Sequence, residues 1–333
     1  MPNVVENFKK RVVEGKYTVF VSSMVVLAMR FSLFYVHGPP QIPVSDTGFL
    51  WQYIAHFFTD PLISFGVSTL FVFLIAFLLS GLNNRFSLIR TRTNLPFLVP
   101  LVLFSLHPVF LTVSPCFFSL TLVLTALFPL LSAYQQTDSR LFSFRSAILI
   151  GLAGLFQIYA LLLLPLWWRG EMTMRGSQPK SFFTFLFGVF LVYISVFSFY
   201  FLIDNVVGFV MPFHYFTQFS TLQAFRFSVV EWIGIILLFG FLLMYVLLSM
   251  NLSARAKKLA LSSTNFMVFI IFFSIIFQAV YWHETKFFFW LNIALISYLI
   301  AYYHSRSTLP VHVFIAIGMT ILLAAFYLLN LLF

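Results

Sequence analysis

Apolar windows as long as a membrane span recur along this chain from residue 17 to residue 333. A helix needs about 20 mainly apolar residues to cross the hydrocarbon core of a bilayer. Of all residues, 61% are apolar and 8% are charged, whereas a soluble domain carries roughly 25% charged residues. Because no soluble fold hides this much apolar surface, we predict an all-α polytopic integral membrane protein.

The windows predict about nine full transmembrane helices. They cover residues 17–36, 62–82, 95–111, 116–133, 182–203, 229–250, 265–281, 287–303 and 311–333. A further apolar stretch, 144–168, carries Gly151, Gly154 and Gln157 near its middle. This stretch is either one long tilted span or a hairpin of two half-helices that turns near 156–158.

The distribution of Lys and Arg favours the hairpin. Basic residues collect on the cytoplasmic side of membrane proteins. With the N-terminus in the cytoplasm and a hairpin at 144–168, all but Arg30, Arg226 and Lys286 of the 19 basic residues fall on that side. A single crossing would place the cluster 169–180 outside and invert every later loop. We therefore predict one transmembrane domain, 1–333, with a basic cytoplasmic N-terminus, 1–16, and long outer loops at 37–61 and 204–228.

The net charge of +10 does not indicate nucleic-acid binding, because the basic residues lie in short clusters between apolar runs. Such clusters are typical of topology signals and contacts with lipid headgroups. The single cysteine, Cys116, excludes an internal disulfide, and no Cys/His cluster has the spacing of a structural zinc site. We predict no cofactor or metal site, and membrane lipids as the partners.

The first outer loop contains a candidate catalytic carboxylate, Asp46, in the sequence PVSDTGFLWQ. An acceptor hydroxyl needs a base within hydrogen-bond reach, and a carboxylate at the mouth of a membrane cavity is suited to that role. The alternative is structural, because SDTG is also typical of an Asx turn or a helix cap. For Arg30, late in the first span, the options are a pair with Asp46 or Asp60 or a side chain that reaches the interface, which we favour.

The second candidate is the short outer turn in YWHETKFFFW, with His283, Glu284 and Lys286 between two apolar spans. Ionisable residues at such positions favour a functional hypothesis. Lys286, with His283 and with Arg226 from the preceding outer loop, is suited to hold a lipid phosphate. The alternative is an interfacial turn whose lysine reaches toward headgroups between anchoring tryptophans. We expect His107, which precedes a proline, to cap or line a helix end.

Three short stretches of this chain resemble the GT-C superfamily of multi-spanning glycosyltransferases. PVSDTGFLWQ is similar to the proline, acidic and glutamine loop of its mannosyltransferase branch, although Asp46 lacks the adjacent second acidic residue of that branch. HETKFFFWLN is similar to the branch's late His-x-x-basic-Phe loop. AILIGLAGLFQIYALLLLPLWW resembles the superfamily's glycine-punctuated paired helices. The whole length resembles more closely an uncharacterised multi-pass inner-membrane family of Bacteroidota-type bacteria.

These resemblances imply a bacterial inner-membrane glycosyltransferase that uses a polyprenyl-phosphate-linked sugar at the outer face. Asp46 would then be the acid/base residue, and His283 with Lys286 would contact the donor phosphate. A non-catalytic subunit or lipid-handling protein of a cell-envelope assembly is the alternative. A secondary transporter is a weaker one, because the chain shows one broken helix pair and no matching repeat.

Overall fold

The structure, a computed structural model, is all-α within the residues that it describes, which confirms the predicted fold class. It describes residues 6, 8–15, 17–38, 48–89, 91–136, 138–176, 178–219, 228–253, 258–282, 285–307 and 310–332. Within these ranges, eight helices are long and apolar enough to cross a membrane, so the chain is a multi-pass membrane protein. They are α2 Thr18–His37, α4 Pro61–Phe86, α6 Pro115–Ser132, α9 Pro179–Leu202, α11 Val229–Ser253, α12 Lys258–Val280, α13 Phe287–Arg306 and α14 Val311–Leu332.

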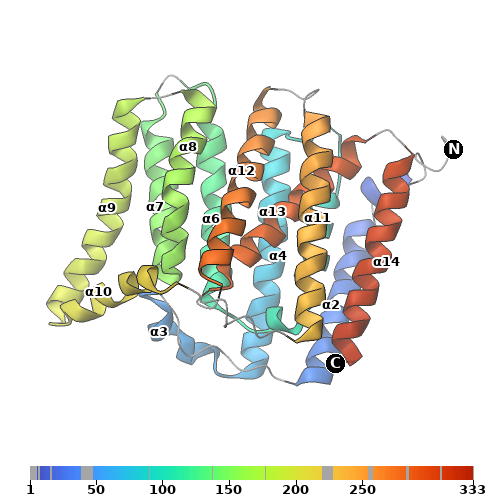
Figure 1. The fold of residues 1–333 in the computed structure, drawn as a ribbon, viewed down its shortest axis with the longest axis horizontal. Coiled ribbons are helices and arrows are strands. Elements are labelled where there is room, and N and C mark those ends of the chain that lie inside the picture. The colour runs from blue at the N-terminus through green and yellow to red at the C-terminus, as the bar shows by residue number, and fades with distance from the viewer. Residues whose placement is uncertain are drawn as a thin grey trace.

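The remaining helices are short. They are α3 Trp51–Ile54, α5 Leu95–Leu103, α7 Arg140–Phe156, α8 Leu163–Arg175 and α10 Val206–His214, with single turns at η1 Lys9–Val13, η2 Ala55–Phe58, η3 Pro108–Phe110, η4 Ile158–Leu162 and η5 Tyr215–Thr217. The long helices run side by side, and α3 and α10 lie across one end of the bundle (Figure 1). We call this the outer end, following the charge-based assignment. The opposite end, where α4, α6, α8, α11 and α13 finish, is the basic end.

The third predicted span, 95–111, differs from the structure, because only its first half is an α-helix, α5. The chain then continues through the non-helical residues 104–107 to η3 and reaches α6. His107 has extended backbone angles, φ −131° and ψ 140°, as the proline after it requires, since a residue before proline avoids the α-helical region. The prediction of a full span is therefore wrong, because α5 ends at Leu103 and the extended His107 before Pro108 prevents the helix from resuming there.

Arg30 stabilises this irregular segment. Its side chain is fully buried and donates to the carbonyls of Phe104 (3.1 Å) and Phe110 (2.9 Å). It also donates to Ser68 Oγ and Thr69 Oγ1 on α4. The favoured option for Arg30, a reach to the interface, is therefore wrong. A pair with Asp60 is wrong too, because Asp60 accepts a hydrogen bond from Leu62 N as the N-cap of α4. Asp46, the other proposed partner, lies outside the described residues.

The stretch 144–168 is the predicted hairpin. Helix α7 ends at Phe156, and η4 and α8 return the chain to the basic end. Glu171, buried on α8, accepts hydrogen bonds from Ser143 Oγ (3.0 Å) and Ser146 Oγ (3.2 Å) near the start of α7. Because the last turns of α8 contact the first turns of α7, the two arms are antiparallel and the stretch does not cross the membrane once.

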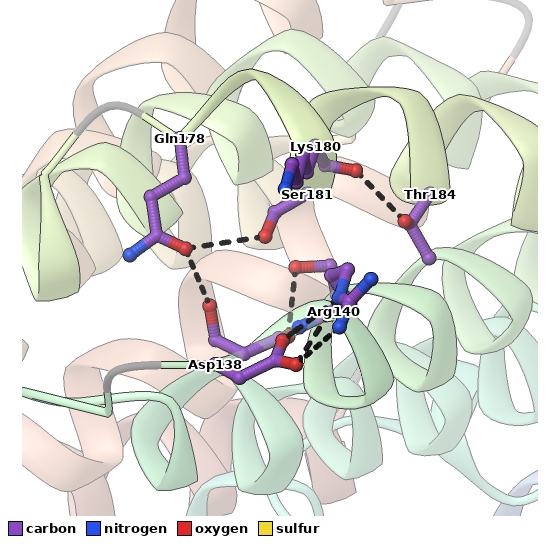
Figure 2. Close-up of polar contacts among 8 residues, drawn as sticks. Asp138, Arg140, Gln178, Lys180, Ser181 and Thr184 are labelled. Carbon is purple, nitrogen blue, oxygen red and sulfur yellow. Dashed lines mark hydrogen bonds and ion pairs between the residues drawn. The ribbon is translucent and has the colours of Figure 1, made fainter.

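The start of α7 also approaches the start of α9 at the basic end (Figure 2). Gln178 Oε1 accepts from Ser139 Oγ and from Ser181 Oγ, each at 3.4 Å. Before α7, the carboxylate of Asp138 pairs with Arg140, 2.6 Å from Arg140 to the carboxylate oxygen. Hydrogen bonds from Arg140 lower the pKa of Asp138 to about 2, so both side chains are charged at neutral pH. The pair is exposed and adds little stability.

Helix α13 is the centre of the fold. It is almost entirely buried and contacts α5, α6, α11, α12 and α14. A membrane helix without lipid contact need not be apolar, and α13 accordingly carries Asn292, Tyr298 and His304 in its interior positions. Asn292 Oδ1 accepts from Ser274 Oγ of α12 at 2.5 Å, which satisfies one of these buried polar groups.

The antiparallel hairpin predicts a definite labelling pattern. Cysteines introduced at Gln136 and Lys180, exposed positions before α7 and after α8, should react with a membrane-impermeant maleimide from the same side. A cysteine at the exposed Thr59, at the outer end, should react from the other side. The native Cys116 is buried and should remain unlabelled. Labelling of 136 and 180 from opposite sides would contradict the hairpin.

Replacement of Arg30 tests its role in holding the segment 104–110. Arg30→Met should leave two buried carbonyls without their donor, at a cost of about 1–3 kcal/mol each, and so lower the thermal midpoint in detergent. Arg30→Lys should fall between wild type and Arg30→Met, because a single ammonium group lacks the fork that reaches both carbonyls. A midpoint of Arg30→Met equal to that of the wild type would show that the segment does not depend on this side chain.

Candidate functional site

The tip of the α7–α8 hairpin, residues 155–159, is the point on which the outer segments dock. Leu155 O accepts hydrogen bonds from Phe49 N (2.7 Å) and Leu50 N (3.0 Å) of the first outer loop. Gly48 lies so close that a Cβ on it would be 2.1 Å from Phe156 O. The glycine of PVSDTGFLWQ is therefore required by a close approach of two backbones, and the loop is attached to the hairpin two residues after Asp46.

Gln157, the next residue of the tip, forms a hydrogen bond with the second candidate segment, the turn before α13. Gln157 Nε2 donates to Thr285 Oγ1 at 2.5 Å, and the same hydroxyl oxygen accepts from Phe287 N at 3.0 Å. From α12, Gln278 donates to Thr285 O (2.9 Å) and accepts from Phe289 N (2.8 Å). The residues that open α13 are thus fixed by two glutamines, one from α12 and one from the hairpin.

The aromatic outer segment 206–217 docks on the same tip. Tyr159 OH donates to Tyr215 O at 3.2 Å, and Tyr281 OH donates to Phe216 O at 3.1 Å. The rings of Tyr159 and Tyr281 lie 4.8 Å apart between centroids. Three outer segments that are far apart in the sequence therefore meet on five consecutive residues of the hairpin.

Beside this junction lies a cavity of about 160 Å³. The loop between α5 and η3 forms one wall, and α11, α13 and α14 form the others. Most of its lining is apolar, and along α13 it extends from Phe289 to Ile300, about 16 Å at 1.5 Å per residue. The polar residues that line it are His107, Glu231, Gln278, Trp282, Lys286 and Trp290.

Two of these polar side chains are engaged in the fold. Gln278 uses both ends of its amide on the turn before α13. Glu231 forms a capping box with Ser228 at the start of α11: its carboxylate accepts from Ser228 N (2.9 Å) and Ser228 Oγ (3.1 Å), and Glu231 N donates to Ser228 Oγ (3.2 Å). The contacts of Glu231 are those of a helix N-terminus, so it is a poor candidate for a proton-transfer group.

Three others offer donors. His107 Nδ1 accepts from Val109 N at 3.1 Å, so the proton of the neutral ring is on Nε2, and the ring stacks on Phe326 with 20° between the planes. Trp290 is 3% exposed, and its indole N–H has no hydrogen-bond partner within the described residues. Lys286 is exposed at the N-cap of α13, four residues before Trp290, which places both on one face of the helix.

Of the predicted site residues, only Lys286 is among the described residues, and it lines the cavity. Asp46, Arg226, His283 and Glu284 lie outside them, so their proposed roles stay predictions. The predicted cap by His107 is confirmed, whereas its place beside Lys286 was not predicted. Trp290 was predicted only as a possible interfacial anchor, and its buried N–H has no signal in the sequence.

Comparison of the chain with family models, with curated proteins and with solved structures finds no match. The resemblances of its loops to known families therefore stay predictions, and the chemistry of the site rests on the described residues. An apolar cavity that is also lined by Lys286 and His107 is suited to an amphiphile with an anionic head.

Gly48→Ala tests the attachment of the first outer loop to the hairpin. The added methyl group would overlap Phe156 O, so the loop must leave the tip, and we expect a lower thermal midpoint and faster proteolysis within residues 38–60. Gly240→Ala is the matched control, because a Cβ there meets no atom within 4 Å. Equal stability and equal proteolysis of the two variants would contradict the docking.

Proposed function

We propose that this chain is a glycosyltransferase that uses a polyprenyl-phosphate-linked sugar at the outer face of the bacterial inner membrane. One observation supports it most directly: the two loops with the candidate chemistry are attached to neighbouring residues of one scaffold. The loop of Asp46 is bonded to Leu155 through Phe49, and the turn of Lys286 is bonded to Gln157 through Thr285. A base and a phosphate-binding cation need such a shared, rigid support to act on one substrate.

In this proposal, Asp46 takes the proton of an acceptor hydroxyl as the hydroxyl oxygen attacks the anomeric carbon of the sugar. The bond between that carbon and the phosphate oxygen breaks, and its electron pair stays with the polyprenyl phosphate. Lys286, with His283 and Arg226, stabilises the negative charge that develops on the leaving phosphate. The products are the glycosylated acceptor and the free lipid phosphate, and the proton resides on Asp46.

A second candidate is a non-catalytic lipid-handling protein of a cell-envelope assembly. It is favoured by the chemistry of the described part of the cavity, whose carboxylate, Glu231, is engaged in a capping box. That part offers groups that bind an anion, among them Lys286 and the Nε2–H of His107. The two candidates differ in one requirement, because only the transferase depends on Asp46.

Two substitutions test the transferase. Asp46→Asn should lower transfer by roughly 10²- to 10⁴-fold, the usual contribution of a general base, and Lys286→Ala by roughly 10²- to 10³-fold, the cost of one lost donor to a developing negative charge. The measurement is transfer of a radiolabelled hexose from synthetic polyprenyl phosphate sugars into membranes that contain the purified chain.

Asp60→Asn is the matched control for Asp46→Asn, because it makes the same chemical change in the same loop and asparagine preserves the N-cap of α4. Lys180→Ala is the control for Lys286→Ala, since Lys180 is exposed at the basic end. Wild-type rates from Asp46→Asn and Lys286→Ala would refute the site. Absence of transfer by the wild-type chain with every donor tested would favour the lipid-handling protein.

A further inference from the structure

Helix α9 lies at one edge of the bundle (Figure 1). It packs chiefly against α7 and α10, and only 17% of its most apolar window is buried. Because so large an exposed apolar surface is stable only in a bilayer, the exposed side of α9 is a lipid-contacting surface. Its exposed apolar side chains include Phe187, Phe190, Phe199, Phe201 and Leu202.

A tight turn after α9 directs α10 across the outer end. Asp204 has a left-handed backbone conformation, φ 53°, and Asn205 N donates to Tyr200 O at 3.0 Å. Asn205 Oδ1 accepts from Gly208 N at 3.0 Å as the N-cap of α10. A Cβ on Gly208 would lie 2.9 Å from Tyr200 Cε1, so the absence of a side chain there lets α10 approach the end of α9 closely.

One face of α10 packs on the bundle through aromatic rings. Phe209 lies 5.2 Å from Phe197 and 5.7 Å from Phe49 between ring centroids. Phe213 lies 5.7 Å from Phe49 and 5.8 Å from Tyr193. Phe49 of the first outer loop therefore contacts two rings of α10, and the position of α10 bears on the position of that loop.

The opposite face of α10, which we call its outward face, is apolar and exposed. It consists of Val207, Val210 and Met211, which are 74%, 57% and 63% exposed and share one side of the helix by their spacing. The segment 205–217 contains no Asp, Glu, Lys or Arg. A helix that covers a protein in water has a polar outer face, whereas this face continues the apolar exposed surface of α9.

The length of α9 places α10 at the level of the lipid headgroups. Its 24 residues extend about 36 Å at 1.5 Å per residue, and the hydrocarbon core is about 30 Å thick. With Lys180, in the first turn of α9, at the interface of the basic end, the other end of α9 reaches the opposite headgroup region. Interfacial helices lie at this level, with their apolar face about 5–10 Å into the boundary of headgroups and acyl chains.

We propose that α10 is an interfacial membrane helix whose outward face inserts among the acyl chains of the leaflet at the outer end. The partner is the uncharged, apolar part of the lipid. Between Lys180 and Arg226 the sequence has one charged residue, Asp204, so this stretch offers no cation to anionic headgroups. Because Phe49 packs on α10, the lipid contact also positions the first outer loop. The interface does not depend on the proposed transferase.

Spin labels measure the depth of α10 directly. Val207→Cys and Val210→Cys are made in a Cys116→Ala background, labelled, and placed as full-length chain in phosphatidylcholine nanodiscs. Collision rates with oxygen and with a water-soluble nickel complex give the depth of each label. Both labels should lie about 5–10 Å below the headgroup boundary. Labels at Phe190→Cys and Gln136→Cys are the references for hydrocarbon and for water.

Addition of phosphatidylglycerol should leave the two depths unchanged, because the insertion uses no cation. Collisions with the nickel complex as frequent as at Gln136→Cys would show that the outward face is in water and would overturn the proposal. Labels shielded from both reagents would also overturn it, since a second copy or another protein would then cover the face. Insertion only in the presence of phosphatidylglycerol would overturn the assignment to uncharged lipid.

Val210→Asp tests the link between the leaflet and the first outer loop. A carboxylate on the outward face favours water over acyl chains, so α10 should leave the leaflet, and proteolysis within residues 38–60 should be faster in nanodiscs. Val210→Leu, which keeps the face apolar, is the matched control. Equal proteolysis of the two variants would contradict the link. The depth measurement uses neither variant, so it decides the proposal even where Val210→Asp does not fold.

Discussion

The constraint on which this fold depends is that backbone polar groups inside a bilayer have no water to satisfy them. Regular helices meet it internally, but this chain interrupts its helices inside the bundle at residues 104–114 and at the hairpin tip. At the first place a long polar side chain supplies the donors, and at the second the backbone N–H groups of Phe49 and Leu50 donate to Leu155 O. Arg30 donates to carbonyls of the first segment, and Gln157 and Gln278 fix the turn that meets the tip.

The same constraint explains which features of the fold the sequence could predict. Apolar length located the spans, and the positions of Lys and Arg identified the hairpin, because burial in lipid and the side of the membrane depend on local composition. The prediction of a full span over 95–111 failed because local composition does not determine the path of this segment. Its composition is apolar throughout, and its path depends on Pro108 and on Arg30, whose partners lie 74 and 80 residues away.

The candidate site was predictable to a smaller extent. Lys286 was found because a charge between two apolar spans is costly and therefore informative. Its partners were not, since Trp290 resembles any interfacial tryptophan and His107 any residue before a proline; only the three-dimensional arrangement places them on one cavity. The contact of Gly48 with Phe156 was hidden for the same reason, because a turn glycine and a close-approach glycine look identical in a sequence.

The cavity lies beside these interruptions of the helices. Where helices are broken, the bundle cannot pack as tightly as at continuous helices, and the cavity lies where α5 stops short against α11 and α13. At the start of α13, Gln278 bonds Thr285 O and Phe289 N, and Thr285 Oγ1 accepts from Phe287 N, so these groups do not depend on the exposed side chain of Lys286. A membrane fold that satisfies its irregular peptide groups with a few side chains can therefore leave another, Lys286, to line the cavity.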